Sequence, residues 1–178
     1  MPRLFVGLDL PTDVQNQLSA NSGGLDGARW ISPQDFHITL RFIGDIDNHI
    51  ADEIDQQLHR LRHEVFTLRS SSLEVFGGRN PRSLCLGIEP EPALTRLQRK
   101  IDTAVRSLTG RTDQKKYTPH ITLARFRHVQ PPELAQFISG LGQPRVRPVE
   151  YTQFHLFSAR DSVGGGPYRI EASYPLQS

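Results

Sequence analysis

The sequence predicts an α+β protein made of two similar lobes, related by a pseudo-two-fold axis, with a functional site in the cleft between them. The tetrapeptide HITL occurs at residues 37–40 and again at residues 120–123. LFVGLD at residues 4–9 and LCLGIE at residues 84–89 also share a glycine and an acidic residue at matching places. A repeat of this long period is not that of a solenoid. We expect one domain over residues 1–178 of two interleaved lobes, with two antiparallel sheets and outer helices.

The first half of the chain predicts strand, helix, strand, helix, strand. Apolar or alternating runs bounded by Gly, Pro, Asn and Asp are typical of strands. They predict strands over residues 4–10, 36–43 and 66–76. Helix-starting residues and apolar side chains at helical spacing predict helices over residues 11–20 and 47–63. Residues 21–28, NSGGLDGA, are expected to form a loop.

The second half repeats this order. The same signals predict strands over residues 84–89, 120–126 and 151–157, and helices over residues 92–108 and 132–138. Glycines at 164–166 predict a turn into a last strand over residues 168–174. We expect FHLF at residues 154–157 to face LEVF at residues 73–76.

The composition is that of a globular chain. Hydrophobic residues make up 37% of the 178 residues, and the net charge is only +2, so a long nucleic-acid groove is not required. No apolar run approaches the roughly 20 residues that span a bilayer, and the first residues lack the pattern of a secretory signal. The single cysteine, Cys85, lies in an apolar run, so we expect a buried thiol. A cytoplasmic protein fits these features.

Each HITL segment offers a histidine and a threonine on one strand face. Side chains alternate along a strand, so His37 and Thr39 lie opposite the aliphatic residues, as do His120 and Thr122. Two imidazoles can divide acid and base duty near neutral pH. In-line opening of a phosphodiester needs the acid and the base on opposite sides of phosphorus. Threonine hydroxyls and an arginine can bind the non-bridging oxygens. The spacing leaves open which histidine is the acid.

The chain resembles the 2H phosphoesterase superfamily, named for two His-x-Thr motifs, and more narrowly its RNA 2',3'-cyclic phosphodiesterases, also known as 2'-5' RNA ligases. The matching stretches are RLFVGLDLP, RWISPQDFHITLRFIGDI, YTPHITLARF and HLFSARDSVGGGPYRI, which begin at Arg3, Arg29, Tyr117 and His155. The resemblance implies a bilobal α+β fold, and hydrolysis of a 2',3'-cyclic phosphate end to a 2'-phosphate without a metal or other cofactor. It also implies possible joining of RNA through a 2'-5' bond, the same chemistry reversed.

The resemblance also implies roles for five residues. His37 would donate a proton to the leaving 3' oxygen, and His120 would accept one from water. Thr39, Thr122 and Arg125 would hold the phosphate. Regular alternation turns Arg125 away from the face of His120, so a β-bulge or the end of the strand would have to redirect it.

Further candidates lie beside the two motifs. By regular alternation, Arg41 lies on the same strand face as His37 and is a candidate phosphate contact. Trp30, Phe36 and Tyr168 either stack on a base or pack in the core. A loop with Arg111, Lys115 and Lys116 either guides the RNA backbone or is merely solvated.

Two other functions remain open. The chain is either a phosphodiesterase or a non-catalytic module that binds an RNA end, and a metal-dependent phosphoesterase is a third possibility. His59 and His63 stand four apart, as metal ligands on a helix can, but no carboxylate completes a set, so we expect a solvated helix face. We expect the same of the remaining histidines, His49, His128 and His155. The expected partner is RNA with a cyclic phosphate end or a small cyclic nucleotide, bound by a monomer without a membrane.

Overall fold

The computed structural model describes residues 3–159 and 166–177. The turn expected at residues 164–166 lies outside this range except for Gly166. No helix within the described ranges is both long and apolar enough to cross a membrane.

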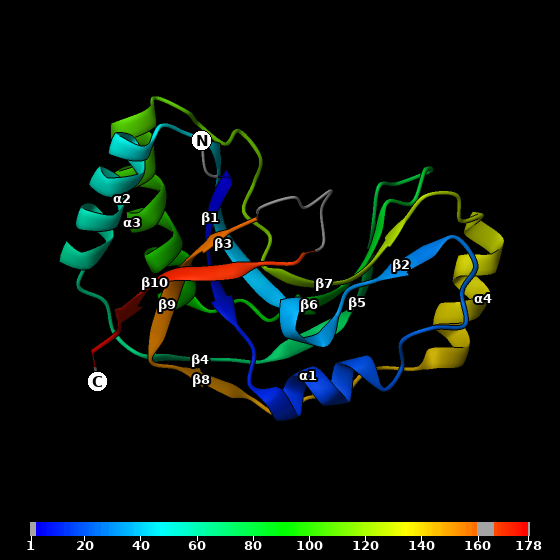
Figure 1. Cartoon of the computed structure of the whole chain (residues 1–178). Coiled ribbons are helices and arrows are strands. Elements are labelled where there is room, and N and C mark those ends of the chain that lie inside the picture. The colour runs from blue at the N-terminus through cyan, green and yellow to red at the C-terminus, as the bar shows by residue number, and fades with distance from the viewer. Residues whose placement is uncertain (1–2, 160–165, 178) are drawn as a thin grey trace.

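Helices separate single strands or groups of strands along the chain (Figure 1). In order, they are β1 (Arg3–Asp9), α1 (Thr12–Ser19), β2 (Ala28–Trp30), the 3-10 helix η1 (Pro33–Asp35), β3 (His37–Asp45), α2 (Asn48–Arg60), β4 (Phe66–Leu68), β5 (Ser70–Phe76), β6 (Ser83–Ile88), α3 (Pro92–Thr109), β7 (His120–Phe126), α4 (Pro131–Leu141), β8 (Val149–Tyr151), β9 (Gln153–Ser158) and β10 (Arg169–Pro175).

The strands form one large antiparallel sheet and one small sheet, which confirms the predicted α+β class. The large sheet has the order β10-β9-β1-β3-β7-β6-β5, with β2 also paired to β7, while β4 and β8 form the small sheet. The two halves of the large sheet meet where Ile38 of β3 pairs with Ile121 of β7. These isoleucines hold the same place in the two HITL segments. The sheets expected for the two lobes are therefore halves of one sheet, joined at the repeat.

The two halves of the large sheet share a break in strand register as well as the HITL segment. Along β3, the register with β1 passes over Leu40 between Thr39 and Arg41. Along β7, the register with β6 passes over Leu123 at the same place in the repeat. Each strand thus carries a β-bulge that reverses the facing of the residues beyond it.

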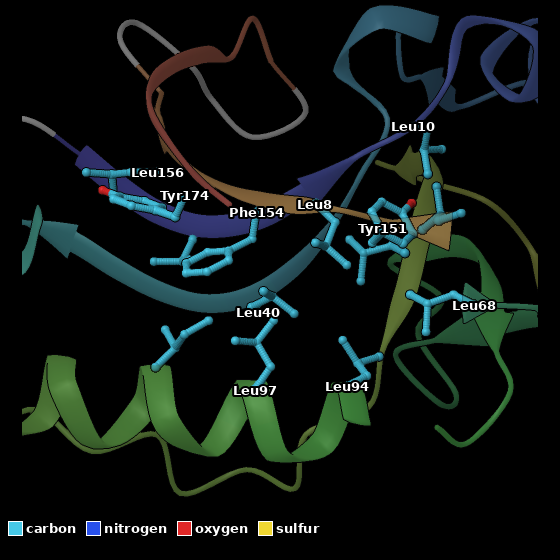
Figure 2. Packing of buried hydrophobic residues seen from close by; sticks show 14 of the residues in the cluster. Leu8, Leu10, Leu40, Leu68, Leu94, Leu97, Tyr151, Phe154, Leu156 and Tyr174 are labelled. Atoms are coloured by element: carbon cyan, nitrogen blue, oxygen red, sulfur yellow. The ribbon is translucent and has the colours of Figure 1, made fainter. Parts of the chain in front are cut away.

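Helix α3 shows how the core positions these strands. Glu91 accepts a hydrogen bond from the Ala93 backbone N–H, Pro92 begins the helix, and Gly110 with φ of 67° ends it. Leu94 and Leu97 on its inner face point toward the sheet side chains that surround Leu40 (Figure 2). A buried leucine stabilises a fold by about 1.5–3 kcal/mol relative to an exposed one.

The helices are exchanged between the halves. Helix α3 follows β6 of the second half but packs against β3 of the first, beside α2 (Figure 1). Helix α1 follows β1 of the first half, yet its Val14 lines a small apolar cavity with Ile88 and Ile121 of the second. Each half therefore packs one of its helices against the other half.

Several predicted elements differ from the structure. The strands expected over residues 66–76 and 151–157 are each divided, because β4 and β8 leave the large sheet to pair with each other. Strand β9 pairs with β1 and β10, and β5 pairs with β6, so FHLF does not face LEVF. These two strands hold equivalent places in opposite halves. The strand β2 lies at the end of the expected loop, and α2 ends at Arg60.

Candidate active site

The two histidines are held in the same way. His37 Nδ1 donates to the Asp35 carbonyl oxygen at 2.9 Å, and His120 Nδ1 donates to the Thr118 carbonyl oxygen at 2.7 Å. A carbonyl can only accept, so each Nδ1 carries a proton and each Nε2 is left to exchange one. Both rings stand on the same face of the sheet on either side of the Ile38–Ile121 pair. The arrangement offers two proton-transfer atoms to one group bound between them.

The surroundings of His37 are apolar on one side. Its Nε2 lies 3.0 Å from Thr39 Oγ1. The rings of Phe5, Phe157 and Tyr168 lie 4.8, 6.1 and 4.8 Å from the His37 ring. Burial lowers the pKa of His37, and the hydrogen bond to Asp35 opposes this shift only in part. The positive charge of Arg125 and the neighbouring His120 lower the pKa further.

A segment near the end of the chain completes this enclosure. Asp35 is buried, and its Oδ1 accepts the Tyr168 backbone N–H at 3.1 Å. Gly166 approaches the same carboxylate so closely that a Cβ would stand 2.4 Å from Oδ2. Asp35 thus binds the His37 ring through its carbonyl and the Tyr168 backbone through its side chain.

The surroundings of His120 are more open. Its ring meets Phe76 edge-on, with centroids 4.6 Å apart. Thr122, two residues further along, has its Oγ1 3.8 Å from the buried Cys85 sulfur, and Ser83 Oγ lies 3.5 Å from that sulfur. Cys85 is fully buried, as the sequence predicts. Because the Cys85 thiol donates to Thr122 Oγ1, the hydroxyl proton of Thr122 stays available to a bound anion.

Arg125 reaches the cleft face because of the bulge at Leu123. Beyond that bulge, Arg125 pairs with Ser83, while Thr122 pairs with Cys85. Ser83 and Cys85 share a face, so Arg125 and Thr122 share one too. Arg125 is exposed, and its charge acts on both His37 and Cys85. The bulge therefore supplies the redirection that an arginine in this role requires.

The corresponding bulge at Leu40 turns Arg41 away from the cleft, so the predicted phosphate contact by Arg41 is wrong. The Arg41 side chain is only 5% exposed, and its Nε lies 3.2 Å from Asp102 Oδ1. It also donates to the Arg111 carbonyl oxygen at 2.7 Å. Arg41 instead ties β3 to α3 and to the loop after α3.

Two of the aromatic candidates belong to the core. Phe36 is 2% exposed and packs within the main hydrophobic cluster. Trp30 pairs with Ala124, on the face away from the cleft, and its ring lies 5.8 Å from Phe137. Arg29 pairs with Arg125 and shares its face. The loop-like composition before Arg29 conceals this short strand, so the sequence does not predict that placement.

Two histidines expected in solvent are buried. His63 Nε2 donates to the Ala93 carbonyl oxygen at 2.7 Å. His155 is 2% exposed and lies between Asp9 and Ser173, at 3.2 and 2.8 Å. The hydrogen bond from His155 holds the pKa of Asp9 below its ordinary value. Asp9 is the cross-strand neighbour of His37, but its carboxylate is bound to His155. Across residues 3–159 and 166–177, no three His, Cys, Asp or Glu side chains gather as metal ligands do.

Comparisons with known proteins agree on one family. Residues 24–161 match the family model described as "2'-5' RNA ligase superfamily". An RNA 2',3'-cyclic phosphodiesterase of Bacillus subtilis is 32% identical over 130 residues, which cover 70% of this chain and 71% of the relative. One of Thermotoga maritima is 28% identical over 176 residues, with 94% and 92% covered. The fold is similar to that of apo LigT from E. coli, with a TM-score of 0.83, 21% identity, and 99% and 98% of the two chains covered.

Proposed function

The chain belongs to the 2'-5' RNA ligase superfamily, and we propose that it is an RNA 2',3'-cyclic phosphodiesterase that opens the cyclic phosphate to a 2'-phosphate. The observation that carries this proposal is the pair of equivalently held histidines on one face of the sheet. Relatives along most of the chain bear the name of this activity. The chemistry needs one base and one acid about a single phosphorus, and the duplicated strands supply one imidazole each.

The reaction moves two protons. His120 Nε2 takes a proton from water as the water oxygen bonds to phosphorus. The bond from phosphorus to the 3' oxygen breaks, and His37 Nε2 gives that oxygen its proton. The products are a 2'-phosphate and a 3'-hydroxyl, and the proton moves back from His120 to His37 through solvent between turnovers.

The anionic phosphate is held by hydroxyl and guanidinium donors. Thr39 and Thr122 stand two residues after the histidines, on the same strand faces. Arg125 adds a positive charge near His37. Donors placed at the developing charge of a transition state are each worth about 10²–10³ in rate. The same negative charge raises the lowered pKa of His37 when substrate binds, which loads the acid for the reaction.

The unequal surroundings of the histidines support this assignment of roles. His37 stands within the rings of Phe5, Phe157 and Tyr168, where a leaving oxygen that stays attached to ribose can remain enclosed. His120 lies on the open side of the site. A water molecule or an alcohol that attacks from outside arrives there. Tyr168 lines the His37 side and is the one aromatic candidate that we retain as a substrate contact.

Residues 1–178 act as one domain of two interleaved lobes in this proposal. We place the protein in the cytoplasm as a monomer, acting on RNA ends or on small cyclic nucleotides without a metal. The non-catalytic RNA-end-binding alternative has no specific observation in its favour.

Product analysis tests the proposed activity. Adenosine 2',3'-cyclic phosphate, or an oligonucleotide with the same end, is incubated with the protein in excess EDTA, beside His37→Ala and His120→Ala. The expected product is the 2'-phosphate, lost in both variants. No turnover by the wild type on either substrate would refute the enzyme assignment, and a reaction that stops in EDTA would refute the metal-independent mechanism.

A further inference from the structure

A groove of about 570 Å³ opens beside His120 and has no role in the hydrolysis described above. Thr39 and His120 stand at its inner end, so it is continuous with the site. Its walls come from both halves of the sheet and from the loop between α3 and β7. The residues that give it chemical character are Phe42, Phe76, Lys115, Lys116 and Tyr117.

The groove exists because β3 and β7 separate beyond the Ile38–Ile121 pair. Side chains, in place of a strand, satisfy the carbonyl groups along this edge of β3. Tyr117 donates to the Thr39 carbonyl oxygen at 3.0 Å, and Arg111 donates to that of Ile43 at 3.0 Å. These bonds hold the loop at a fixed distance from β3. The groove is therefore a built feature of the fold.

An exposed aromatic side chain lies on one wall. Phe42 is 55% exposed, although it is a large apolar residue in the middle of a strand. The bulge at Leu40 turns it to the cleft face, at the place that Arg125 holds in the second repeat. Phe76 stands on the other wall against the His120 ring. Exposed aromatic faces are the surfaces on which unpaired bases stack.

The charge of the groove is positive. Asp102 and Asp113 line it together with the buried Arg41, which lies within ion-pair distance of both, so these three residues leave one negative charge against the two lysines. Lys115 and Lys116 are exposed on the loop, and in the part of the chain that the structure describes neither ammonium is paired with a carboxylate. Two such charges beside aromatic rings match the backbone and bases of a single strand.

We propose that this groove binds an RNA strand that carries a 5'-hydroxyl, the acceptor in a joining reaction. The inference rests on the proposed function, in which His120 serves the nucleophile. In-line attack places the nucleophile opposite the 3' oxygen, so a strand that brings it must enter on the His120 side. The 5' oxygen bonds to phosphorus and its proton goes to His120. The bond to the 3' oxygen breaks, and His37 protonates that oxygen, which yields a 2'-5' diester.

The ratio of product joined to an acceptor to product hydrolysed by water tests this assignment. An oligonucleotide with a 2',3'-cyclic phosphate end is incubated with a 5'-hydroxyl oligonucleotide or with methanol, and hydrolysed and joined products are counted. The variants are Phe42→Ala and the double variant Lys115→Ala with Lys116→Ala. Controls are Ile170→Ala, another exposed apolar residue, and the double variant Arg60→Ala with Arg99→Ala, which removes two exposed charges from α2 and α3.

The wild type should join RNA in a saturable way. Each groove variant should raise the RNA concentration for half-maximal joining about tenfold or more, with hydrolysis and methanol addition within about twofold of the wild type. The lysine variant should also show a weaker salt dependence of joining, by about one in log–log slope. The controls should match the wild type.

Three outcomes would overturn the assignment. Joining of RNA that does not saturate, or that is equal in wild type and groove variants, would show that no acceptor binds there. Slower hydrolysis of the oligonucleotide with an unchanged partition would show that the groove holds the cyclic-phosphate strand instead. A wild type that neither hydrolyses nor joins would overturn the proposed function itself, which separates that failure from the first two.

Discussion

Ile38 of β3 pairs with Ile121 of β7, and the two residues occupy the same position in the two copies of HITL. The pseudo-two-fold axis therefore passes between them. Antiparallel pairing about this point puts the histidine of one copy next to the threonine of the other. Duplication of one short strand thus places two imidazoles on one face of the sheet, as the proposed reaction requires.

The pH dependence should reflect the lowered pKa of His37. As the proton donor, His37 must be protonated, so kcat/KM should fall as pH rises through its pKa in the free enzyme. That pKa lies below 6.5, because burial and the charge of Arg125 lower it. The phosphate charge raises it in the complex, so kcat should hold to a higher pH than kcat/KM does. Rate profiles in saturating and limiting substrate measure both.

Arg125→Gln should move the falling limb of kcat/KM to higher pH, because it removes one cause of the lowered pKa. Arg127→Gln, an exposed neighbour, serves as its control. A limb that stays in place in Arg125→Gln, or that moves equally in both variants, would contradict the electrostatic account.

The two arginines of the repeat should respond in opposite ways to substitution by methionine. Arg41→Met breaks a buried ion pair with Asp102, so the free energy of unfolding should fall by about 2–4 kcal/mol. The folded variant should keep kcat within about threefold. Arg125→Met removes an exposed charge, so stability should hold while kcat/KM falls about 10²-fold. Urea unfolding and steady-state rates of both variants distinguish the cases, and a large loss of kcat in folded Arg41→Met would contradict the buried role.

Gly7 should tolerate no side chain. An added Cβ would stand 2.7 Å from the Ile38 backbone oxygen, so β1 and β3 would have to separate between His37 and Thr39. Gly7→Ala should lower the free energy of unfolding by about 1–3 kcal/mol and should reduce kcat in the folded fraction. Gly140→Ala is the control, since open space surrounds that position. Equal stability of the two variants by thermal unfolding would show that the strands yield without cost.

The sequence predicts most of the helices and strands and the pair of histidines, because hydrophobic periodicity and the repeated HITL segment can be read from the residues directly. The strand over residues 120–126 matches β7, and the predicted helix over residues 92–108 matches α3 within one residue. The bulges could not be located from the sequence, since Leu40 and Leu123 continue the alternation begun by Ile38 and Ile121, and a leucine side chain does not mark a bulge. The bulge at Leu40 turns Arg41 into the protein, and the bulge at Leu123 turns Arg125 to the cleft face.

Long-range pairing was the other missing information. The loop-like residues before Arg29 conceal β2, which forms because β7 offers it an edge. His155 is buried because Asp9 and Ser173, distant in the sequence, supply its partners. Neither pairing leaves a local signal.

In the mechanism that we propose, His37 gives a proton to the leaving oxygen while His120 takes one from the nucleophile. A direct test compares His37→Ala and His120→Ala on the cyclic phosphate and on the para-nitrophenyl ester of a 3'-deoxynucleoside 2'-phosphate. The nitrophenolate of this ester leaves without a proton, and its sugar has no 3' hydroxyl that could attack phosphorus. His37→Ala should lose about 10²–10⁴-fold on the cyclic phosphate but stay within about tenfold of the wild type on the ester. His120→Ala should lose activity on both. An equal loss on both substrates in His37→Ala, or rescue of His120→Ala instead, would contradict the assignment.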